Sequence, residues 1–460
     1  MFAETGCPYF DRDFRKLAAL AEVQVATPEA LSALLGEMYA SIFDVDFTNY
    51  RVEVLAPKSE TILAQVNNLR ITLRDRIPQW SRAGLMTAEV QRRLRDVFRA
   101  SRYATDMLGE LMIGYDDLSP GEEEYPAFTG PHLNTLIHPG LGDSGGALEI
   151  RTGDIIVVRG TIHNSAAIAR IGDVDSQFSH VGIVHIGPDG RKVIVEALIE
   201  DGATITDYDA AMNHALARAV LFRHPDAELA AKAAQRIYDR VQRSREPAGT
   251  HIDYDFSMEL KGYDRLFCAK LVRQAYDEAS HSLVRMPTFP TTFRTASADF
   301  LASIGVTAEE TFAPGDMELE ADFQAVAEWR DYRKTSLVRL QDMVMVKLFE
   351  WMEQKGYSFR ETFLIHLISR LGRASSHLPE ALKTALSSVF PKVPHNMRRE
   401  TIAAIAMLHK TAQPLLEQLL AMERAAIAAS QRPLHPREIY AFLDGVEQKS
   451  DGRIGYLRRR

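Results

Sequence analysis

The sequence predicts an α+β protein in which a small antiparallel sheet lies between two helical regions. Three observations support this fold class. Apolar residues recur at helical spacing in the first and last parts of the chain, short runs rich in β-branched residues occupy the middle, and stretches rich in Pro and Gly separate the parts. With 460 residues, of which 46% are hydrophobic, the chain is long enough for two or three domains.

Residues 1–117 are expected to form an N-terminal helical region. Thr27, Pro28 and Glu29 are typical of a helix start, because threonine supplies a capping hydroxyl and proline suits the first turn. Apolar residues then recur every third or fourth position, and a second stripe of this kind follows residue 87. Such stripes indicate a packed helical bundle.

Residues 118–152 are predicted to be a loop or linker, because Pro, Gly and acidic residues dominate them. The segment contains GDSGG at 142–146, the string that surrounds the nucleophilic serine of trypsin-like proteases. Those enzymes place their histidine and aspartate on β-barrels upstream of the serine, whereas the upstream region here is helical. We therefore expect a glycine-rich turn at Ser144 and no nucleophile there.

Residues 153–312 are predicted to form the domain that contains the sheet. Helical patterns at 227–245 and 264–279 follow the β-like runs, which indicates an α+β arrangement with mostly antiparallel strands. The runs are GDIIVVRG (153–160), HVGIVHI (180–186), KVIVEAL (192–198), GATITDY (202–208) and RAVLFRH (218–224).

Residues 313–460 are expected to be a C-terminal helical region. Apolar stripes run through 337–351 and 402–419, and further helices are expected near 358–371 and 435–446.

Composition narrows the classes of function. The formal net charge of −8 is spread along the chain without a basic stripe interleaved with aromatics, which argues against nucleic acid as a partner. No stretch approaches the roughly 20 apolar residues that span a bilayer, and the N-terminus lacks the pattern of a secretion signal, so a cytoplasmic location is expected. Two cysteines, Cys7 and Cys268, exclude a disulfide framework and metal sites built on cysteine pairs.

A hairpin in the middle region brings a histidine near a carboxylate. Residues 187–190 read Gly-Pro-Asp-Gly, which suits a three-residue loop whose last glycine adopts the left-handed conformation. This loop pairs Gly187 with Arg191, so that His180 and Glu196 lie diagonally on one face, roughly 7 Å apart at Cβ. A two-residue loop would instead turn Glu196 to the opposite face.

A cysteine lies near the start of a later predicted helix. Asp264 is a candidate cap, which places Cys268 in about the first turn, where free amides and the helix dipole favour thiolate over thiol. Cys268, His180 and Glu196 then fit the roles of nucleophile, base and orienting carboxylate. From the residues alone, Cys268 also suits apolar filler of a helix face, His180 and Glu196 also suit structural roles, and other histidines compete as base. These are His163, His185, His214 and His251.

The succession of these segments resembles the circularly permuted papain-like amidases, the YiiX-like group of the NlpC-like superfamily. The resemblance rests on TGDIIVVRG, FSHVGIVHI, VIVEAL, IDYDFS and DRLFCAKLV and covers roughly residues 150–300. In that group the histidine-bearing strand precedes the cysteine-bearing helix, and the order here agrees. The resemblance implies that the catalytic histidine, acidic residue and nucleophile are His180, Glu196 and Cys268.

The sequence departs from the family pattern after the nucleophile, where Ala269 and Lys270 stand in place of serine and glutamate. The nucleophile is unaffected, but a shared substrate or oxyanion contact is altered. On geometric grounds the backbone amide of Cys268 is the first candidate for an oxyanion donor, and Tyr254 is the second.

These observations predict a cysteine-dependent hydrolase that cleaves an amide, ester or thioester through an acyl-enzyme on Cys268. An acyltransferase with the same three residues and a catalytically silent binding module remain as alternatives. The resemblance implies peptides, N-acyl amides or lipid acyl groups as substrates, and it requires no metal or organic cofactor. The helical flanks have no counterpart in small family members and could restrict access, shape a groove or bind a protein partner.

Overall fold

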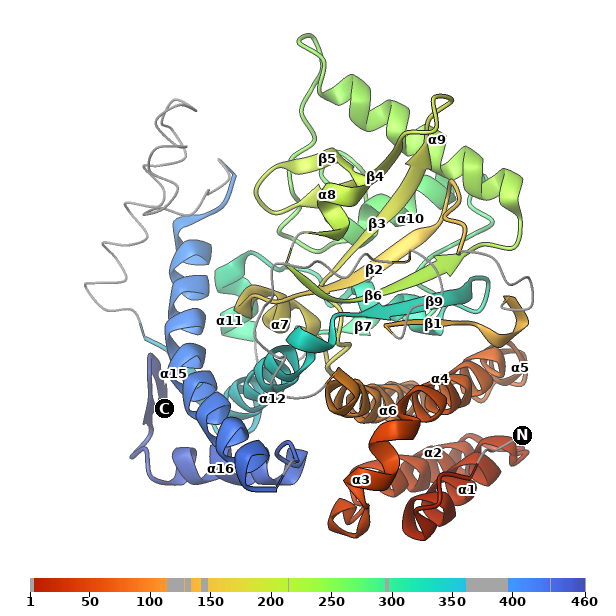
Figure 1. Cartoon of the computed structure of the whole chain (residues 1–460). Helices are drawn as coiled ribbons and strands as arrows, with labels where there is room; N and C mark the ends of the chain where they lie inside the picture. Colours follow the sequence, from red (N-terminus) through yellow and green to blue (C-terminus); the bar gives the residue numbers. More distant parts are fainter. Residues whose placement is uncertain are drawn as a thin grey trace.

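The computed structural model has one large sheet with helical segments before and after it, which confirms the expected α+β fold class (Figure 1). The residues that the structure describes are 4–113, 128, 134–141, 148–213, 215–293, 298–360, 396–430 and 432–459. Ser144 with the GDSGG string, and His214, lie outside the described residues.

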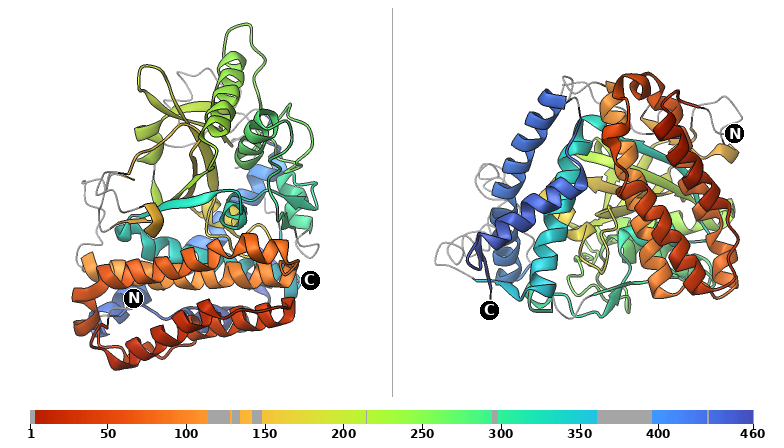
Figure 2. Two further views of the ribbon diagram at one scale, coloured as in Figure 1. Left: turned by 90° about the vertical axis from the view of Figure 1, so that its right-hand side faces the viewer. Right: turned by 90° about the horizontal axis from the view of Figure 1, so that it is seen from below.

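The N-terminal region forms helices in two layers. Figure 2 shows α4 and α6 nearer the sheet, with α1 and α2 on their outer side. The predicted start of α2 is confirmed, because the hydroxyl of Thr27 accepts a hydrogen bond from the amide of Ala30 at 3.2 Å. The helices are α1 (Pro8–Glu22), α2 (Pro28–Phe43), α3 (Val52–Leu55), α4 (Ser59–Asp75), α5 (Ile77–Arg82) and α6 (Ala88–Ile113), with 3₁₀ turns η1 (Phe47–Asn49) and η2 (Ala56–Lys58).

The sheet has seven antiparallel strands in the order β1-β9-β6-β2-β3-β4-β5. The strands are β1 (Thr135–Ile137), β2 (Ile155–Gly160), β3 (His180–Ile186), β4 (Lys192–Leu198), β5 (Gly202–Asp207), β6 (Leu216–Arg223) and β9 (Gln324–Arg330).

Two of these strands lie outside residues 153–312, the range expected for the sheet domain. β1 belongs to the expected linker, and β9 to the expected C-terminal helical region, where it pairs with both β6 and β1. The expected limits at 152 and 312 therefore cut through the sheet. The run QAVAEWR in β9 is buried on both faces, so it lacks the alternation that marks a half-exposed strand.

Helices cover the sheet domain and complete its two cores. α9 and α10 pack against β3 and β4, and a large apolar core lies between these helices and one face of the sheet. The other face packs against α8. The helices and small elements of this part are α7 (His163–Ala169), α8 (Tyr208–Met212), α9 (Ala227–Ser244), α10 (Cys268–Ala279), α11 (Ala298–Ile304), β7 (Thr291–Thr292), β8 (Glu310–Thr311), η4 (Pro139–Leu141) and η6 (Pro314–Leu319).

The C-terminal region is mainly helical. Its elements are α12 (Tyr332–Gln354), α15 (Arg399–Ser430), α16 (Pro436–Gln448) and the strands β10 (Tyr357–Phe359), β11 (Arg453–Ile454) and β12 (Leu457–Arg459) of a small sheet. The helix expected near 358–371 is wrong at its start, because residues 357–359 pair with β12 as a strand. Residues 361–371 lie outside the described residues. None of the helices described is long and apolar enough to cross a membrane.

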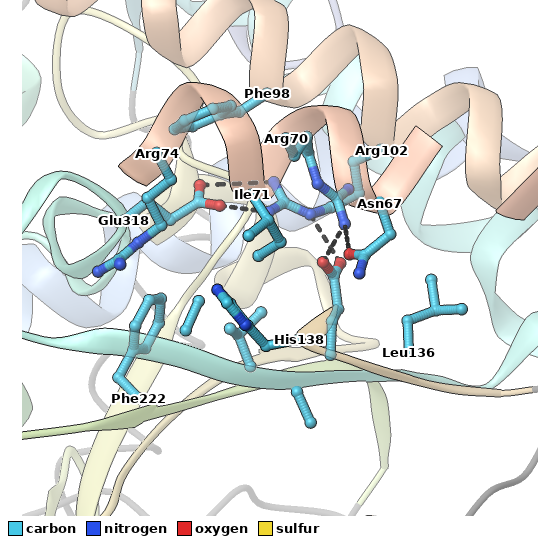
Figure 3. A pocket seen from close by; sticks show the side chains of 14 residues that line it. Asn67, Arg70, Ile71, Arg74, Phe98, Arg102, Leu136, His138, Phe222 and Glu318 are labelled. Atoms are coloured by element: carbon cyan, nitrogen blue, oxygen red, sulfur yellow. Dashed lines mark hydrogen bonds and ion pairs between the residues drawn. The ribbon is translucent and has the colours of Figure 1, made fainter. Parts of the chain in front are cut away.

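A buried cluster of charges joins the N-terminal helices to the sheet. Figure 3 shows Arg70 and Arg102, from α4 and α6, directed toward the sheet around a small cavity. Glu328 of β9 accepts hydrogen bonds from Arg70, from Nε of Arg102 at 2.9 Å and from Nη2 of Arg330 at 2.6 Å. Arg102 also pairs with Glu318. These ion pairs fix the helical layer against the edge of the sheet.

Candidate active site

The hairpin between β3 and β4 has the loop that the sequence predicts. The amide of Gly187 donates to the carbonyl of Arg191 at 2.9 Å, and Gly190 has a φ of +80°, which glycine adopts without steric cost. The pairs from Ile186 with Lys192 to Ile183 with Val195 extend the same register. The predicted three-residue loop is therefore confirmed, and the two-residue alternative is excluded.

This register places His180 and Glu196 within hydrogen-bond distance. Nε2 of His180 lies 2.6 Å from Oε2 of Glu196. Because an ionised carboxylate only accepts, the ring is the donor. Gly182 lies between the two on the same face, and a Cβ added there would stand 2.4 Å from Cγ2 of Ile194 and 3.5 Å from Cβ of Glu196. A side chain at this position would therefore collide with Ile194 of the neighbouring strand.

Thr206 holds the carboxylate from the other side. Its hydroxyl donates to Oε1 of Glu196, so that both carboxylate oxygens have a partner. Thr206 pairs with Ile194 across β4 and β5, which makes it the diagonal neighbour of Glu196. The sequence analysis missed this residue. Extending the hairpin argument to the turn before Gly202 would have placed Thr206 on this face.

Cys268 is the first residue of α10. The residue that precedes the helix is Phe267, so the expected cap at Asp264 is wrong and the helix begins later than that cap implies. The reason is that residues 264–267 stay extended enough for Leu266 to bridge with Tyr254. The first helical hydrogen bond runs from the amide of Leu271 to the carbonyl of Phe267 at 3.0 Å. The amide of Cys268 therefore has no acceptor within the helix.

The structure brings Cys268 and His180 together, although they come from a helix and a strand. His180 lies 2.6 Å from Glu196 and close enough to Cys268 for both side chains to act on the charge of its ring. Burial alone would lower the pKa of His180, but these two partners outweigh it and raise the pKa to about 10. Since Nε2 faces Glu196, Nδ1 is the ring nitrogen left for the sulfur. Glu196, His180 and Cys268 thus lie in series, with a hydrogen bond between the first two and an electrostatic interaction between the last two.

The competing histidines have other partners. Nε2 of His163 lies 2.7 Å from the Gln413 side chain, and His163 packs against the ring of His409. The other two competing histidines within the described residues also have partners: His185 pairs with Gln235 and stacks on Tyr238, and His251 lies 3.7 Å from Asp253. Of the histidines that the structure describes, His180 is the one that lines a hollow together with Cys268.

Two hollows of different character meet at the sulfur. A wide groove contains the polar side chains of His180, Glu196, Thr206 and the exposed Glu200, set among mainly apolar lining residues. A second cavity, apolar and with about 900 Å³ of empty space including its mouth, lies between the sheet domain and α15. The residues common to both linings are Asn164, Ile168, Ile199, Tyr254 and Cys268.

Lys270 has a structural role that explains its presence after the cysteine. Its Nζ lies 2.7 Å from Oδ2 of Asp255 and donates to the carbonyl of Lys261 at 3.0 Å, with the side chain buried. Lys270 lines neither hollow. The ion pair instead fixes the loop that carries Tyr254 beside Cys268.

The segment before His180 is held by the N-terminal helices. Gln177 adopts a φ of +61°, which side chains other than glycine rarely do, and it is fully buried. Nη1 of Arg102 donates to its side-chain oxygen at 2.9 Å, and Arg218 donates to its carbonyl at 3.3 Å. The buried charge cluster of Figure 3 therefore reaches to within three residues of His180.

Comparison with known proteins agrees with the resemblance predicted from the motifs. Residues 149–325 match the model of a family described as permuted papain-like amidase enzyme, YaeF/YiiX, C92 family. The match includes His180, Glu196 and Cys268 and ends inside β9, and it leaves out the N-terminal helices and α12, α15 and α16. A search of curated proteins gave no match. The matched part is thus similar to cysteine amidases and hydrolases of papain-like fold.

Proposed function

We propose that the protein is a cysteine-dependent hydrolase in which Cys268 is the nucleophile, His180 the general acid and base, and Glu196 the group that orients His180. The observation that carries the proposal is the placement of Glu196, His180 and Cys268 in series: Glu196 is hydrogen-bonded to His180, and Cys268 lies beside the ring at a helix start that borders two hollows. The family match of residues 149–325 supports the same class of chemistry.

The reaction follows from these contacts. The sulfur of Cys268 attacks the carbonyl carbon of an amide, ester or thioester, and the C–S bond forms as the carbonyl oxygen takes up negative charge. The free amide of Cys268 is the first candidate to donate to that oxygen, and the hydroxyl of Tyr254 is the second. The bond to the leaving group then breaks, and the proton on His180 passes to that group.

Water completes the cycle. His180, now neutral, accepts a proton from water as the oxygen attacks the thioester carbonyl, and the C–S bond breaks to release the acid and the free thiolate. The two neighbours Glu196 and Cys268 raise the pKa of His180 to about 10, which favours the protonated ring between turnovers. An acyltransferase would differ only in the acceptor that replaces water.

Alkylation with iodoacetamide at pH 6 tests the proposal. We expect Cys268 to react at least tenfold faster than free cysteine, and we expect His180→Ala to lose that advantage, because the imidazolium no longer stabilises the thiolate. Cys7 is fully buried and serves as an internal control within each sample. His185→Ala, a change on the same strand, is the matched control and should retain the rate.

Slow labelling of Cys268 that is equal in the parent and in His180→Ala would overturn the proposal and favour a binding module. Intact mass after addition of an activated ester would reveal the acyl-enzyme. Its discharge by water, or only by an added amine, distinguishes the hydrolase from the acyltransferase.

A further inference from the structure

We propose that the small cavity between α4 and the sheet binds a monovalent inorganic anion of the size of chloride or bromide. The cavity is the one in Figure 3, where the N-terminal helices meet the edge of the sheet. It shares no lining residue with the two hollows at Cys268, and the family match does not include α4. The inference therefore does not depend on the proposed function.

Two arginines of α4 that border the cavity have donors without an acceptor among the described residues. Arg70 and Arg74 lie one turn apart, on the same face of the helix. Nη2 of Arg70 donates to Asn67 and Glu328, whereas its Nη1 has no hydrogen-bond partner. Nη2 of Arg74 donates to the carbonyl of Glu320 at 2.8 Å, and its Nε has no partner. Because the two residues are only 5% and 8% exposed, these unused donors are costly unless a ligand accepts from them.

A histidine faces these arginines from the side of the sheet. Figure 3 shows the ring of His138, the residue after β1, directed toward α4. Its Nδ1 accepts a hydrogen bond from the amide of Gly140 at 3.0 Å, so Nε2 carries the ring hydrogen. Within the described residues Nε2 makes no hydrogen bond, and it lies 3.5 Å from a carboxylate oxygen of the exposed Asp75. The ring is thus a third donor at the cavity.

The charges around the cavity leave positive charge in excess. Its described lining contains three arginines and two glutamates, and all four carboxylate oxygens already accept from arginines. Burial opposes the charge of Arg102, but Glu318 and Glu328 outweigh burial and raise the pKa of this arginine. For Arg70 and Arg74 burial prevails and lowers the pKa. A bound anion would supply the counter-charge that these two buried cations lack.

The size and the walls of the cavity restrict the anion that fits. The cavity measures about 30 Å³, whereas one water molecule needs roughly 10–15 Å³. It therefore has room for a single small ion and excludes organic anions. Apolar side chains form much of the wall, including Ile71, Phe98, Leu136 and Phe222. Such a wall disfavours strongly hydrated and divalent anions, because they lose the most free energy on leaving water, so bromide and chloride should bind in preference to fluoride and sulfate.

Thermal unfolding in sodium bromide and in sodium fluoride, at equal ionic strength, tests the inference in solution. General salt effects make fluoride the more stabilising of the two, so a specific site for bromide reverses the order. We expect the melting temperature to be higher in bromide by about 2 °C, because the anion binds only the folded state. Arg74→Met removes a donor and a positive charge and should abolish this gain. Arg82→Met, which changes an exposed arginine of α5, is the matched control and should preserve it.

Crystals soaked in sodium bromide locate the ion. We expect an anomalous peak in the cavity, within hydrogen-bond distance of at least two of the three donors on Arg70, Arg74 and His138. Ile71→Phe keeps all three donors but fills the cavity, so it should lose both the peak and the gain in melting temperature, and it replaces Arg74→Met if that variant does not fold. A cavity that holds only water in the soaked crystals, or bromide peaks confined to the surface, would overturn the inference. A bromide gain of equal size in the parent and in the variant used would overturn it as well.

Discussion

Two clusters of buried charge in this protein differ in the cation that pairs with the carboxylate, and this difference determines whether the pair can exchange a proton. In the cluster of Figure 3, Glu328 is surrounded by arginines, and these outweigh burial and hold the pKa of the carboxyl well below its usual range. At the candidate active site, Glu196 faces one histidine and one hydroxyl. Arginine keeps its proton under all ordinary conditions, whereas histidine exchanges it.

The two clusters also differ in solvent exposure. Arg102 is almost fully buried, with 1% of its surface exposed, and both of its carboxylate partners lie in the same interior. His180 lines a groove and retains 23% side-chain exposure. The first cluster therefore fixes one layer of the protein against another, whereas the second places a titratable ring beside an open groove.

The largest effect is expected for Arg102→Leu, which removes the cation from between two buried carboxylates. Leaving Glu318 and Glu328 with fewer positive partners should lower the free energy of unfolding by about 3–5 kcal/mol. Urea denaturation measures the change. Arg92→Leu, on the same helix in an exposed pair with Glu89, is the control and should cost about 0–1 kcal/mol. Equal losses in the two variants would contradict a structural role for the cluster.

The second-largest effect is expected for Glu196→Gln, which should change the titration of His180. Glu196→Gln should lower the pKa of His180 from about 10, because a neutral amide no longer stabilises the imidazolium. The protonated form is then lost at a lower pH, and we expect the midpoint to move down by about 1–3 pH units. NMR titration of the ring measures it directly. Glu200→Gln removes an exposed carboxylate from the same groove and should leave the midpoint nearly unchanged.

If Glu196→Gln and Glu200→Gln shift the titration of His180 equally, the direct contact with Glu196 is not what holds the proton.

The smallest effect is expected for Thr206→Val, which keeps the shape of the side chain but removes the donor to Glu196. We expect the alkylation rate of Cys268 at pH 6 to fall by about threefold to tenfold, corresponding to one hydrogen bond of about 1 kcal/mol. Thr206→Ser, which retains the hydroxyl, should restore the rate. Thr204→Val is the matched control, because Thr204 lies directly opposite Glu196 and borders the same groove. A loss as large in Thr204→Val would mean that packing and not the hydroxyl supports Glu196.

The local sequence was sufficient to predict those features that depend only on residues close together in the chain. The loop at Gly187 fixed the register of β3 and β4, and with it the meeting of His180 and Glu196, because side chains alternate along a strand. The cap at Asp264 failed because Leu266 bridges to Tyr254, a contact from another segment. β9 was missed for a different reason. A strand that is buried on both faces shows no alternation of apolar and polar residues that the sequence could reveal.

The sequence by itself determined the fold class and the hairpin, because short-range periodicity and turn chemistry specify them, and its resemblance to a known family singled out Cys268, His180 and Glu196 among the candidate residues. Only the tertiary structure decided that Thr206 supports Glu196, that Arg102 reaches the segment before His180, and that α15 closes an apolar cavity beside Cys268. These contacts join residues from 10 to more than 130 positions apart, and no local pattern encodes which side chains meet once the layers pack.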